Sequence, residues 1–264
     1  MKIGLIGFGN LGKAFIAGLV HAGIAQEDLC ITAKTERTLA AARQLYEKAY
    51  VVSDKKELVH FSDIIILSVE PKNAGEVFEE LNGADLDRKM IVSFMSGINI
   101  SDIVNALVKC SGNFSVVRAM PNIAISTGKG IAGISYNNAP EKDIDQLVQL
   151  LEKLGLVLTV SENELVNITL SASSGMAAVC TLIESYQNEI KNYLSAESAA
   201  KITQYVFAGT LPLLQDHTAK ELQDAIATKG GVTEAGLKAL DEVKIQSELK
   251  NFFQAAMDRI NRKN

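Results

Sequence analysis

The chain has 264 residues and a formal net charge of −5, with 47% hydrophobic and 22% charged residues. This composition is typical of a soluble globular protein with one large or two modest domains, and the acidic balance argues against nucleic acid or an anionic membrane surface as a partner. Three cysteines and three histidines lie scattered without CxxC spacing, so we expect no disulfide framework, no metal site and a cytoplasmic location.

The first half of the sequence alternates short apolar runs with helical patterns, which predicts parallel strands and helices in a doubly wound α/β sheet. The run Ile64-Ile65-Ile66-Leu67 is typical of a strand that is covered on both faces. Strands are expected at residues 2–6, 29–33, 50–52, 63–69, 90–94 and 114–117, with 131–136 closing or extending the sheet, and helices at 11–22 and 35–46.

A glycine-rich loop, Gly7-Phe8-Gly9-Asn10-Leu11-Gly12, joins the first strand to the first helix and fits the spacing G-x-G-x-x-G. Gly7 would permit a tight turn, Gly9 would let a pyrophosphate approach the backbone, and Gly12 would allow close helix–strand contact. The helix start offers free N–H groups to phosphates. A glycine pattern alone could be an ordinary turn, but the strand–loop–helix context is what the motif requires. We therefore predict a Rossmann-type domain whose cofactor contacts include Gly7, Gly9, Asn10, Leu11 and Gly12.

The end of the second strand bears on the choice of cofactor. Enzymes that prefer NAD usually carry Asp or Glu there, about 20 residues past the glycines, to hold the ribose hydroxyls. This chain has Thr32-Ala33-Lys34-Thr35-Glu36-Arg37 instead. Lys34, Thr35 and Arg37 could hold the 2′-phosphate of NADP(H), although Glu36 could turn inward and these charges could simply be solvated. The sequence favours NADP(H) and leaves NAD(H) open.

Two further segments follow strands at the carboxyl edge of the sheet, where ligands of such folds bind. They are Ser68-Val69-Glu70-Pro71 and Phe94-Met95-Ser96-Gly97. Both are candidate walls for the nicotinamide ribose, and either could equally be an ordinary strand exit. The cofactor candidates here are Ser68, Val69, Glu70, Pro71, Ser96 and Gly97.

From about residue 141 the strand pattern fades, apart from residues 157–160. Apolar residues from Ile144 to Leu154 keep helical spacing, and Gly155 is expected to end that helix. Beyond Glu162 the chain reads as almost wholly helical. We therefore expect a dinucleotide-binding domain at residues 1–160 and a helical dimerisation and substrate domain at 161–264. No apolar stretch is expected to reach the length of a membrane-spanning helix.

Three clusters of small, hydroxyl or polar residues remain: 117–122 (Val-Arg-Ala-Met-Pro-Asn), 169–178 and 228–237. A helix start or a Gly-Gly turn can present backbone N–H groups to a carboxylate, but small residues also serve close helix packing. Together and in this order, the clusters make the chain resemble the pyrroline-5-carboxylate reductase family from residue 1 to about 260. Thr169, Ser174, Gly175 and Ala177 fall on its helix-start motif, and Gly230, Gly231, Thr233 and Gly236 fall on its turn.

Several positions depart from that family's pattern. Ser173 and Met176 stand where the family has glycine and proline, and Val232 replaces the first threonine of the turn. The other departures are Ala178 for tyrosine, Lys229 for proline, Ile123-Ala124 for Thr-Pro and Glu70 for lysine. Fold and cofactor class survive these changes, but several line the expected substrate pocket, so the substrate does not follow from the resemblance alone.

The resemblance implies NADPH-dependent reduction of the cyclic imine 1-pyrroline-5-carboxylate to L-proline, which is mainly positioning work. It implies that Thr233 hydrogen bonds the imine nitrogen or its attendant water, and that N–H groups around Gly231–Thr233 hold the substrate carboxylate. Glu162 would bind the ring nitrogen, or would be a solvated surface residue. The implied substrate residues are Met120, Pro121, Glu162, Ser174, Gly175, Gly230, Gly231, Val232 and Thr233, with Thr233 as the catalytic one. The helical domain implies a homodimer or a higher homo-oligomer.

Two alternatives remain, and a third is disfavoured by a missing lysine. A related imine or keto-acid reductase with an altered substrate would share all these features. A 3-hydroxyacid dehydrogenase of the 6-phosphogluconate type needs a catalytic lysine on the first long helix of its second domain, and no lysine occurs between Lys153 and Lys191. A non-catalytic paralogue that binds NADP(H) and acts as a regulator would also combine an intact glycine loop with an altered pocket.

Overall fold

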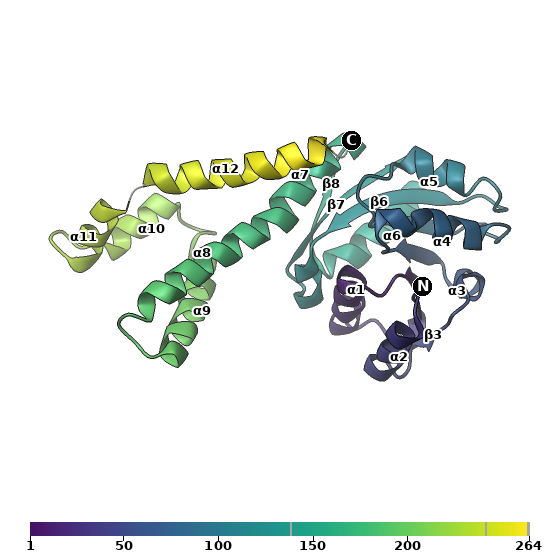
Figure 1. Ribbon diagram of the computed structural model, residues 1–264, viewed down its shortest axis with the longest axis horizontal. Helices are drawn as coiled ribbons and strands as arrows, with labels where there is room; N and C mark the ends of the chain where they lie inside the picture. The colour runs from purple at the N-terminus through teal and green to yellow at the C-terminus, as the bar shows by residue number, and fades with distance from the viewer. Residues whose placement is uncertain (138, 241, 263–264) are drawn as a thin grey trace. The chain divides into compact units, whose positions relative to one another are not determined.

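The computed structural model describes residues 1–137, 139–240 and 242–262, and these form two compact units, Met1–Ser173 and Ser174–Asn264. The described part of the first unit contains an eight-stranded sheet in the order β3-β2-β1-β4-β5-β6-β7-β8 (Figure 1). Strands β1 to β6 are parallel, β7 is antiparallel to β6, and β8 is parallel to β7. The strands are β1 Ile3–Ile6, β2 Leu29–Thr32, β3 Tyr50–Val51, β4 Ile64–Leu67, β5 Met90–Ser93, β6 Ser115–Pro121, β7 Gly130–Asn137 and β8 Gly155–Thr159.

Helices cover both faces of this sheet, as a doubly wound fold requires. The two faces belong to separate hydrophobic clusters: Ile64 and Ile66 of β4 join one, while Ile65 and Leu67 join the other. Helices α1, α2 and α6 contribute to the first cluster, and α3, α4 and α5 to the second. The helices of this unit are α1 Asn10–His21, α2 Glu36–Leu45, α3 Lys55–Phe61, α4 Ala74–Leu81, α5 Ile100–Ala106, α6 Glu141–Glu152 and α7 Leu165–Ile168. The predicted fold class, a mostly parallel doubly wound sheet followed by a helical region, is confirmed.

The last part of the sheet differs in detail from the sequence-based expectation. Strand β6 continues to Pro121, beyond the predicted end at residue 117. Gly155 does not end α6, which stops at Glu152; it is instead the first residue of β8, with a φ of 142°. A Cβ at Gly155 would lie 2.0 Å from the carbonyl oxygen of Gly130 on the neighbouring strand, so close strand pairing explains this glycine.

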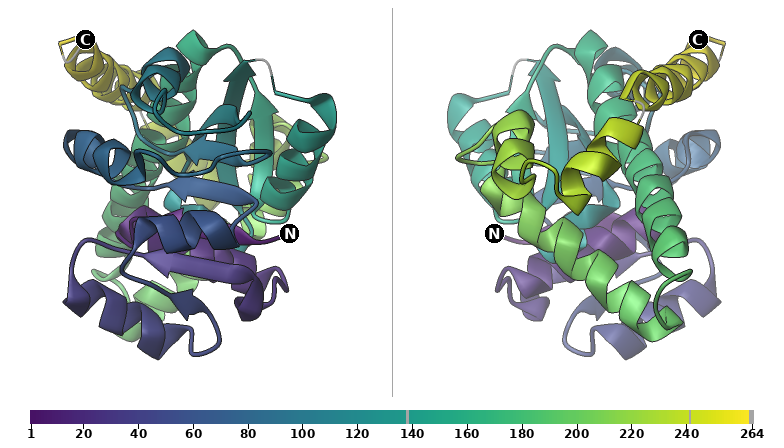
Figure 2. Two further views of the ribbon diagram at one scale, coloured as in Figure 1. Left: turned by 90° about the vertical axis from the view of Figure 1, so that its right-hand side faces the viewer. Right: turned by 90° about the vertical axis from the view of Figure 1, so that its left-hand side faces the viewer.

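The second unit is helical and buries few of its own side chains. Its helices are α8 Gly175–Ile190, α9 Ala196–Leu213, α10 Ala219–Ile226, α11 Val232–Ala239 and α12 Glu242–Asn261 (Figure 2). Helices α8 and α9 pack through an edge-to-face contact between Tyr186 and Phe207, whose ring centroids are 5.7 Å apart. Both hydrophobic clusters of buried residues lie in the first unit among the described residues. The second unit therefore presents large apolar side chains on its surface, among them Val179, Leu182, Tyr186, Tyr205 and Val206.

One sequence-based expectation about membranes is wrong. By length and composition alone, the helical segment Glu162–Ile190 is apolar enough to cross a membrane, with a mean hydropathy of 1.5 over its most apolar stretch. Only 17% of that stretch is buried within the chain. One such helix is weak evidence for a membrane span, because helices that cover apolar surfaces in soluble assemblies have the same composition.

Candidate functional site

The glycine loop after β1 has the geometry that its spacing predicts. Gly7 adopts a φ of 106°, and its N–H donates to the carbonyl of Thr32 at the end of β2. A Cβ at Gly7 would lie 2.3 Å from the carbonyl oxygen of Ser68, and one at Gly12 would lie 2.2 Å from the carbonyl oxygen of Gly7. Both glycines are therefore required by the protein's own backbone packing.

Gly9 differs from its two neighbours in the motif. It is the N-cap of α1, has an ordinary φ of −78°, and a Cβ there would meet nothing within 4 Å. No side chain caps this helix, and the first backbone hydrogen bond of α1 is from Lys13 N–H to Gly9. The N–H groups of Asn10, Leu11 and Gly12 begin the helix without intrahelical partners, and the open space at Gly9 fits a diphosphate that approaches the backbone there.

The segment after β2 carries the cations expected for a 2′-phosphate. Thr35 is the N-cap of α2 and accepts the N–H of Thr38. Glu36 does not turn toward the strand ends, because it pairs with Arg43 further along α2 at 2.5 Å. Lys34 pairs with Glu76 of α4 at 2.5 Å, and more than half of the Lys34 side chain remains exposed. A ligand phosphate would therefore meet Lys34 with one acidic competitor nearby.

The two segments at the ends of β4 and β5 lie where the sequence predicted. The Ser68 N–H donates to Ile6, so this segment adjoins the glycine loop directly. Glu70 pairs with Lys72 at 2.6 Å, which holds the pKa of Glu70 below its usual range. After β5, Gly97 adopts a φ of 74°, which turns the chain toward α5.

An ion pair joins Arg118 of β6 to Glu162 in the turn after β8, and hydrogen bonds extend it to the beginning of α5. The guanidinium Nη1 of Arg118, whose side chain is 8% exposed, lies 3.0 Å from Oε1 of Glu162 and 3.3 Å from Oδ1 of Asn99. The same Glu162 oxygen accepts the N–H of Ile100 at 2.7 Å. Arg118 pairs in register with Ser93, the last residue of β5, so the cluster is level with the carboxyl end of that strand. Glu162 is therefore a fixed carboxylate at this edge rather than a freely solvated one.

This cluster lies beside a hollow of about 350 Å³ that Glu162 lines together with Ile100, Tyr136 and Ser161. The sequence placed Glu162 at the site and included Arg118 in the 117–122 cluster, but it gave Arg118 no role and did not indicate Asn99. The available signal was a charged residue in the middle of the apolar run Ser115-Val116-Val117-Arg118-Ala119-Met120, because an arginine at such a buried position needs an anionic partner.

Met120 and Pro121 end β6, and both are buried within the first unit. The next residue, Asn122, ties this strand end to the segment before α8, because its side-chain amide donates to the carbonyl of Ala172 at 3.0 Å. That segment, Thr169–Ser174, forms a π-helical turn before α8 begins at Gly175. Irregular helical turns of this kind are frequent at functional sites.

The Gly-Gly turn belongs to the second unit, as do Ser174 and Gly175. Gly230 adopts a φ of 74°, Gly231 is the N-cap of α11, and the N–H of Gly231 donates to Thr228. Val232 is 93% exposed and Thr233 is exposed. The structure thus places the predicted cofactor residues, Met120, Pro121 and Glu162 in the first unit, and the Thr233 group in the second.

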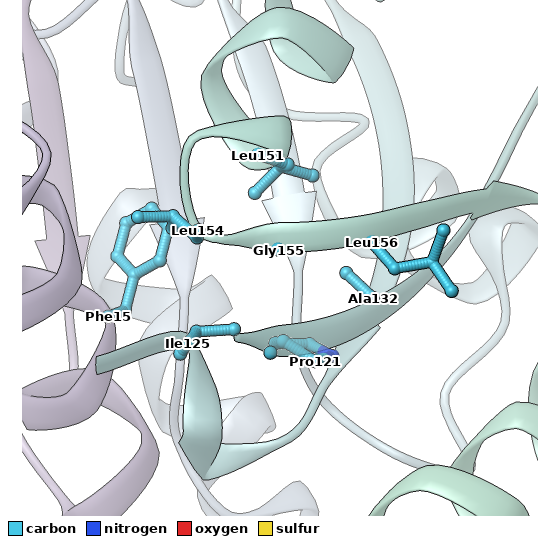
Figure 3. A pocket seen from close by; sticks show the side chains of 9 residues that line it. Phe15, Pro121, Ile125, Ala132, Leu151, Leu154, Gly155 and Leu156 are labelled. Carbon is cyan, nitrogen blue, oxygen red and sulfur yellow. The ribbon is translucent and has the colours of Figure 1, made fainter. Parts of the chain in front are cut away.

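A second hollow in the first unit has a different character. It is lined by Phe15, Ile125, Leu151, Leu154 and Leu156 together with nearby backbone, and Figure 3 shows Phe15, Ile125 and Leu154 close together near the start of β8, with Leu156 farther along that strand. It exposes no polar surface and has no room for a water molecule. It is a packing seam of the core and adds nothing to the candidate site.

Comparisons with known proteins cover both units. Residues 2–97 match the family model described as NADP oxidoreductase coenzyme F420-dependent, and residues 162–263 match the model for pyrroline-5-carboxylate reductase dimerisation. The curated pyrroline-5-carboxylate reductase 2 of Bacillus subtilis (strain 168) is 32% identical over 254 residues, which are 94% of this chain and 90% of that protein. The pyrroline-5-carboxylate reductase of Aquifex aeolicus is 29% identical over 99% of this chain and 94% of its own.

Solved structures show the same likeness. A pyrroline-5-carboxylate reductase from Coxiella burnetii has a similar fold, with a TM-score of 0.84 and 24% identity over 99% of this chain and 97% of that one. Plasmodium falciparum pyrroline carboxylate reductase, solved with NADP bound, gives a TM-score of 0.81 at 25% identity and covers 98% of this chain and 97% of its own.

Proposed function

This chain is a member of the pyrroline-5-carboxylate reductase family, and from that premise we propose that it reduces 1-pyrroline-5-carboxylate to L-proline with NADPH. The observation that carries the proposal is the 32% identity to a curated reductase over 94% of the chain. The family relationship makes the protein an NAD(P)H-dependent oxidoreductase, and the open space above Gly9 supports dinucleotide binding at the glycine loop.

NADP(H) is the favoured cofactor. Lys34 lies two residues after the end of β2 and Arg37 is the second residue of α2, near where a 2′-phosphate would be recognised. Glu36 pairs with Arg43 instead of turning toward the ribose. The related Plasmodium falciparum structure carries NADP. The bound cofactor would supply a hydride to the carbon of the imine C=N bond.

The protein's contribution is to bind and orient a ring that has a carboxylate on one side and an imine nitrogen on the other. The backbone N–H groups around Gly231–Thr233 would hold the carboxylate, since they begin α11 without a side-chain cap. The Thr233 hydroxyl would hydrogen bond the imine nitrogen or its water. In the first unit, Glu162 is held in place by Arg118 and by the Ile100 N–H.

We also propose that the chain forms a homodimer through its second unit and works in the cytoplasm. The matched dimerisation model supports assembly of identical chains. The exposed Val179, Leu182 and Tyr186 of α8 and Tyr205 and Val206 of α9 offer an apolar surface that a second copy would cover. Burial against a partner accounts for the apolar character of Glu162–Ile190 without a membrane.

The direct test is product identification. The purified protein is incubated with 1-pyrroline-5-carboxylate and NADPH, and L-proline and NADP are quantified by chromatography. Equal amounts of the two products support the proposal. Tight NADPH binding without proline would leave the fold and cofactor class standing and direct the search to other imines or keto acids, or to a non-catalytic regulator.

A further inference from the structure

We propose that Glu234 limits the selectivity of the substrate site for a carboxylate-bearing imine, because its own carboxylate occupies part of the anion-binding turn at the start of α11. This inference rests on the proposed function, which assigns the substrate carboxylate to the N–H groups around Gly231–Thr233. It adds a residue of this chain that competes with the substrate for that turn.

The geometry of the turn shows the competition. The Gly230 N–H donates to Oε2 of Glu234 at 2.6 Å, and the Gly231 N–H donates to the carbonyl of Thr228 at 2.9 Å. Helix α11 then begins at Val232 with no side-chain cap at Gly231. A carboxylate of the protein is thus bound to the Gly230 N–H, directly before the N–H groups to which the substrate carboxylate is assigned.

Glu234 remains a charged competitor at neutral pH. Lys238, one helical turn later, lies 3.0 Å from Oε1 of Glu234, and one third of the Glu234 side chain is exposed. The hydrogen bond from Lys238, and then that from the Gly230 N–H, hold the pKa of Glu234 below its usual range. The anion is therefore stabilised in place by a neighbouring cation and by the backbone.

The position of Glu234 differs from an ordinary capping glutamate in the same unit. In α10, Glu221 reaches back to its own N-cap residue and accepts the Thr218 N–H at 2.8 Å. Glu234 reaches past the N-cap Gly231 to Gly230. Glu221 closes a capping box that has no assigned ligand, whereas Glu234 sits at the turn assigned to the substrate.

Two carboxylates at one helix start repel each other, and the Gly230 N–H that serves Glu234 is not available to a second carboxylate. A substrate with a carboxylate must displace Glu234 or tolerate its charge. An imine without a carboxylate, such as 1-pyrroline, meets neither penalty. The structure therefore assigns Glu234 to the discrimination between these two kinds of ring.

The experiment measures kcat/KM with NADPH for 1-pyrroline-5-carboxylate and for 1-pyrroline, and takes their ratio. In Glu234→Gln we expect the ratio to rise about threefold to tenfold, through a lower KM for the carboxylate substrate. The matched control Glu221→Gln removes the same charge from a helix start in the same unit, and its ratio should equal that of the wild type.

A second variant moves the ratio in the opposite direction. Lys238→Gln leaves Glu234 in place but removes the cation that partly neutralises it, so the ratio should fall below that of the wild type. This variant keeps the proposal testable if Glu234→Gln weakens the fold, which thermal unfolding of each protein would reveal.

An active wild type whose ratio is unchanged in Glu234→Gln and Lys238→Gln would overturn the inference alone. A proportional loss for both substrates would also overturn it, because that is the behaviour of a purely structural cap. A wild type that reduces neither imine would overturn the proposed function, and the inference with it.

Discussion

Substituting Gly9 by alanine separates cofactor binding from folding in the glycine loop. Gly9 has an ordinary φ of −78°, and a Cβ there would meet nothing within 4 Å. The protein alone therefore gives no reason for a glycine at this position. If a diphosphate approaches the backbone here, the added methyl group will occupy the space that the phosphate needs.

The two expected effects differ in size. Alanine is a poorer N-cap residue than glycine, but it also lowers the conformational entropy of the unfolded chain. These two effects nearly cancel, so Gly9→Ala should change the free energy of unfolding by no more than about 0.5 kcal/mol. Losing one or two charge-assisted hydrogen bonds to phosphate corresponds to about 2 to 3 kcal/mol, or a roughly 30- to 150-fold weaker Kd for NADPH. Gly12→Ala should instead destabilise the fold by about 1 to 3 kcal/mol, because its Cβ would lie 2.2 Å from the carbonyl oxygen of Gly7.

Calorimetric titration with NADPH and urea unfolding measure the two quantities on the same preparations. Gly209→Ala, in α9 of the second unit, is a matched control, because a Cβ there also meets nothing within 4 Å. It should leave the Kd for NADPH unchanged. A Gly9→Ala protein that binds NADPH like the wild type would refute the assignment of the diphosphate to this loop, and a large loss of stability would refute the argument from open space.

Three further predictions concern charges and a thiol in the first unit. Lys34→Gln should weaken NADPH binding about tenfold and leave NADH binding nearly unchanged, since only NADPH carries the 2′-phosphate; equal losses in a fluorescence titration would contradict the Lys34 assignment. Glu162→Gln should lower the free energy of unfolding by about 1 to 3 kcal/mol, because Arg118 would stay buried without its anion, and an unchanged urea midpoint would argue against that pair. Burial raises the pKa of the Cys30 thiol to about 12, so the reactive thiolate is scarce below that pH. Alkylation of Cys30 should therefore require unfolding, and rapid labelling of the native protein would show this reasoning to be wrong.

Much of the first unit could be predicted because its signals are local. The apolar run at β4 predicts a buried strand, and the glycine loop predicts a tight turn, each from only a few residues. Apolar residues at helical spacing also predicted α6 and the helices of the second unit. These elements need only hydrophobic periodicity and backbone conformation, which a single sequence carries directly.

The parts that could not be predicted depend on contacts between distant residues. Arg118 and Glu162 are 44 positions apart, and the sequence around neither residue indicates that the two form an ion pair. Gly155 was assigned to the end of a helix, because its actual role, close approach to Gly130, arises only when β7 and β8 pair. The direction of the Glu36 side chain was likewise open until Arg43 lay beside it.

The most direct test of the central claim is the initial rate of NADPH oxidation with 1-pyrroline-5-carboxylate, measured for the wild type, Thr233→Ala and Thr233→Ser. The account predicts turnover by the wild type, a loss of kcat/KM of about 10²- to 10³-fold in Thr233→Ala, and substantial recovery in Thr233→Ser, because the hydroxyl is what the reaction needs. Wild-type turnover that is indifferent to Thr233→Ala would contradict the assignment of Thr233. A wild type that binds NADPH but does not oxidise it with this imine would contradict the claim itself.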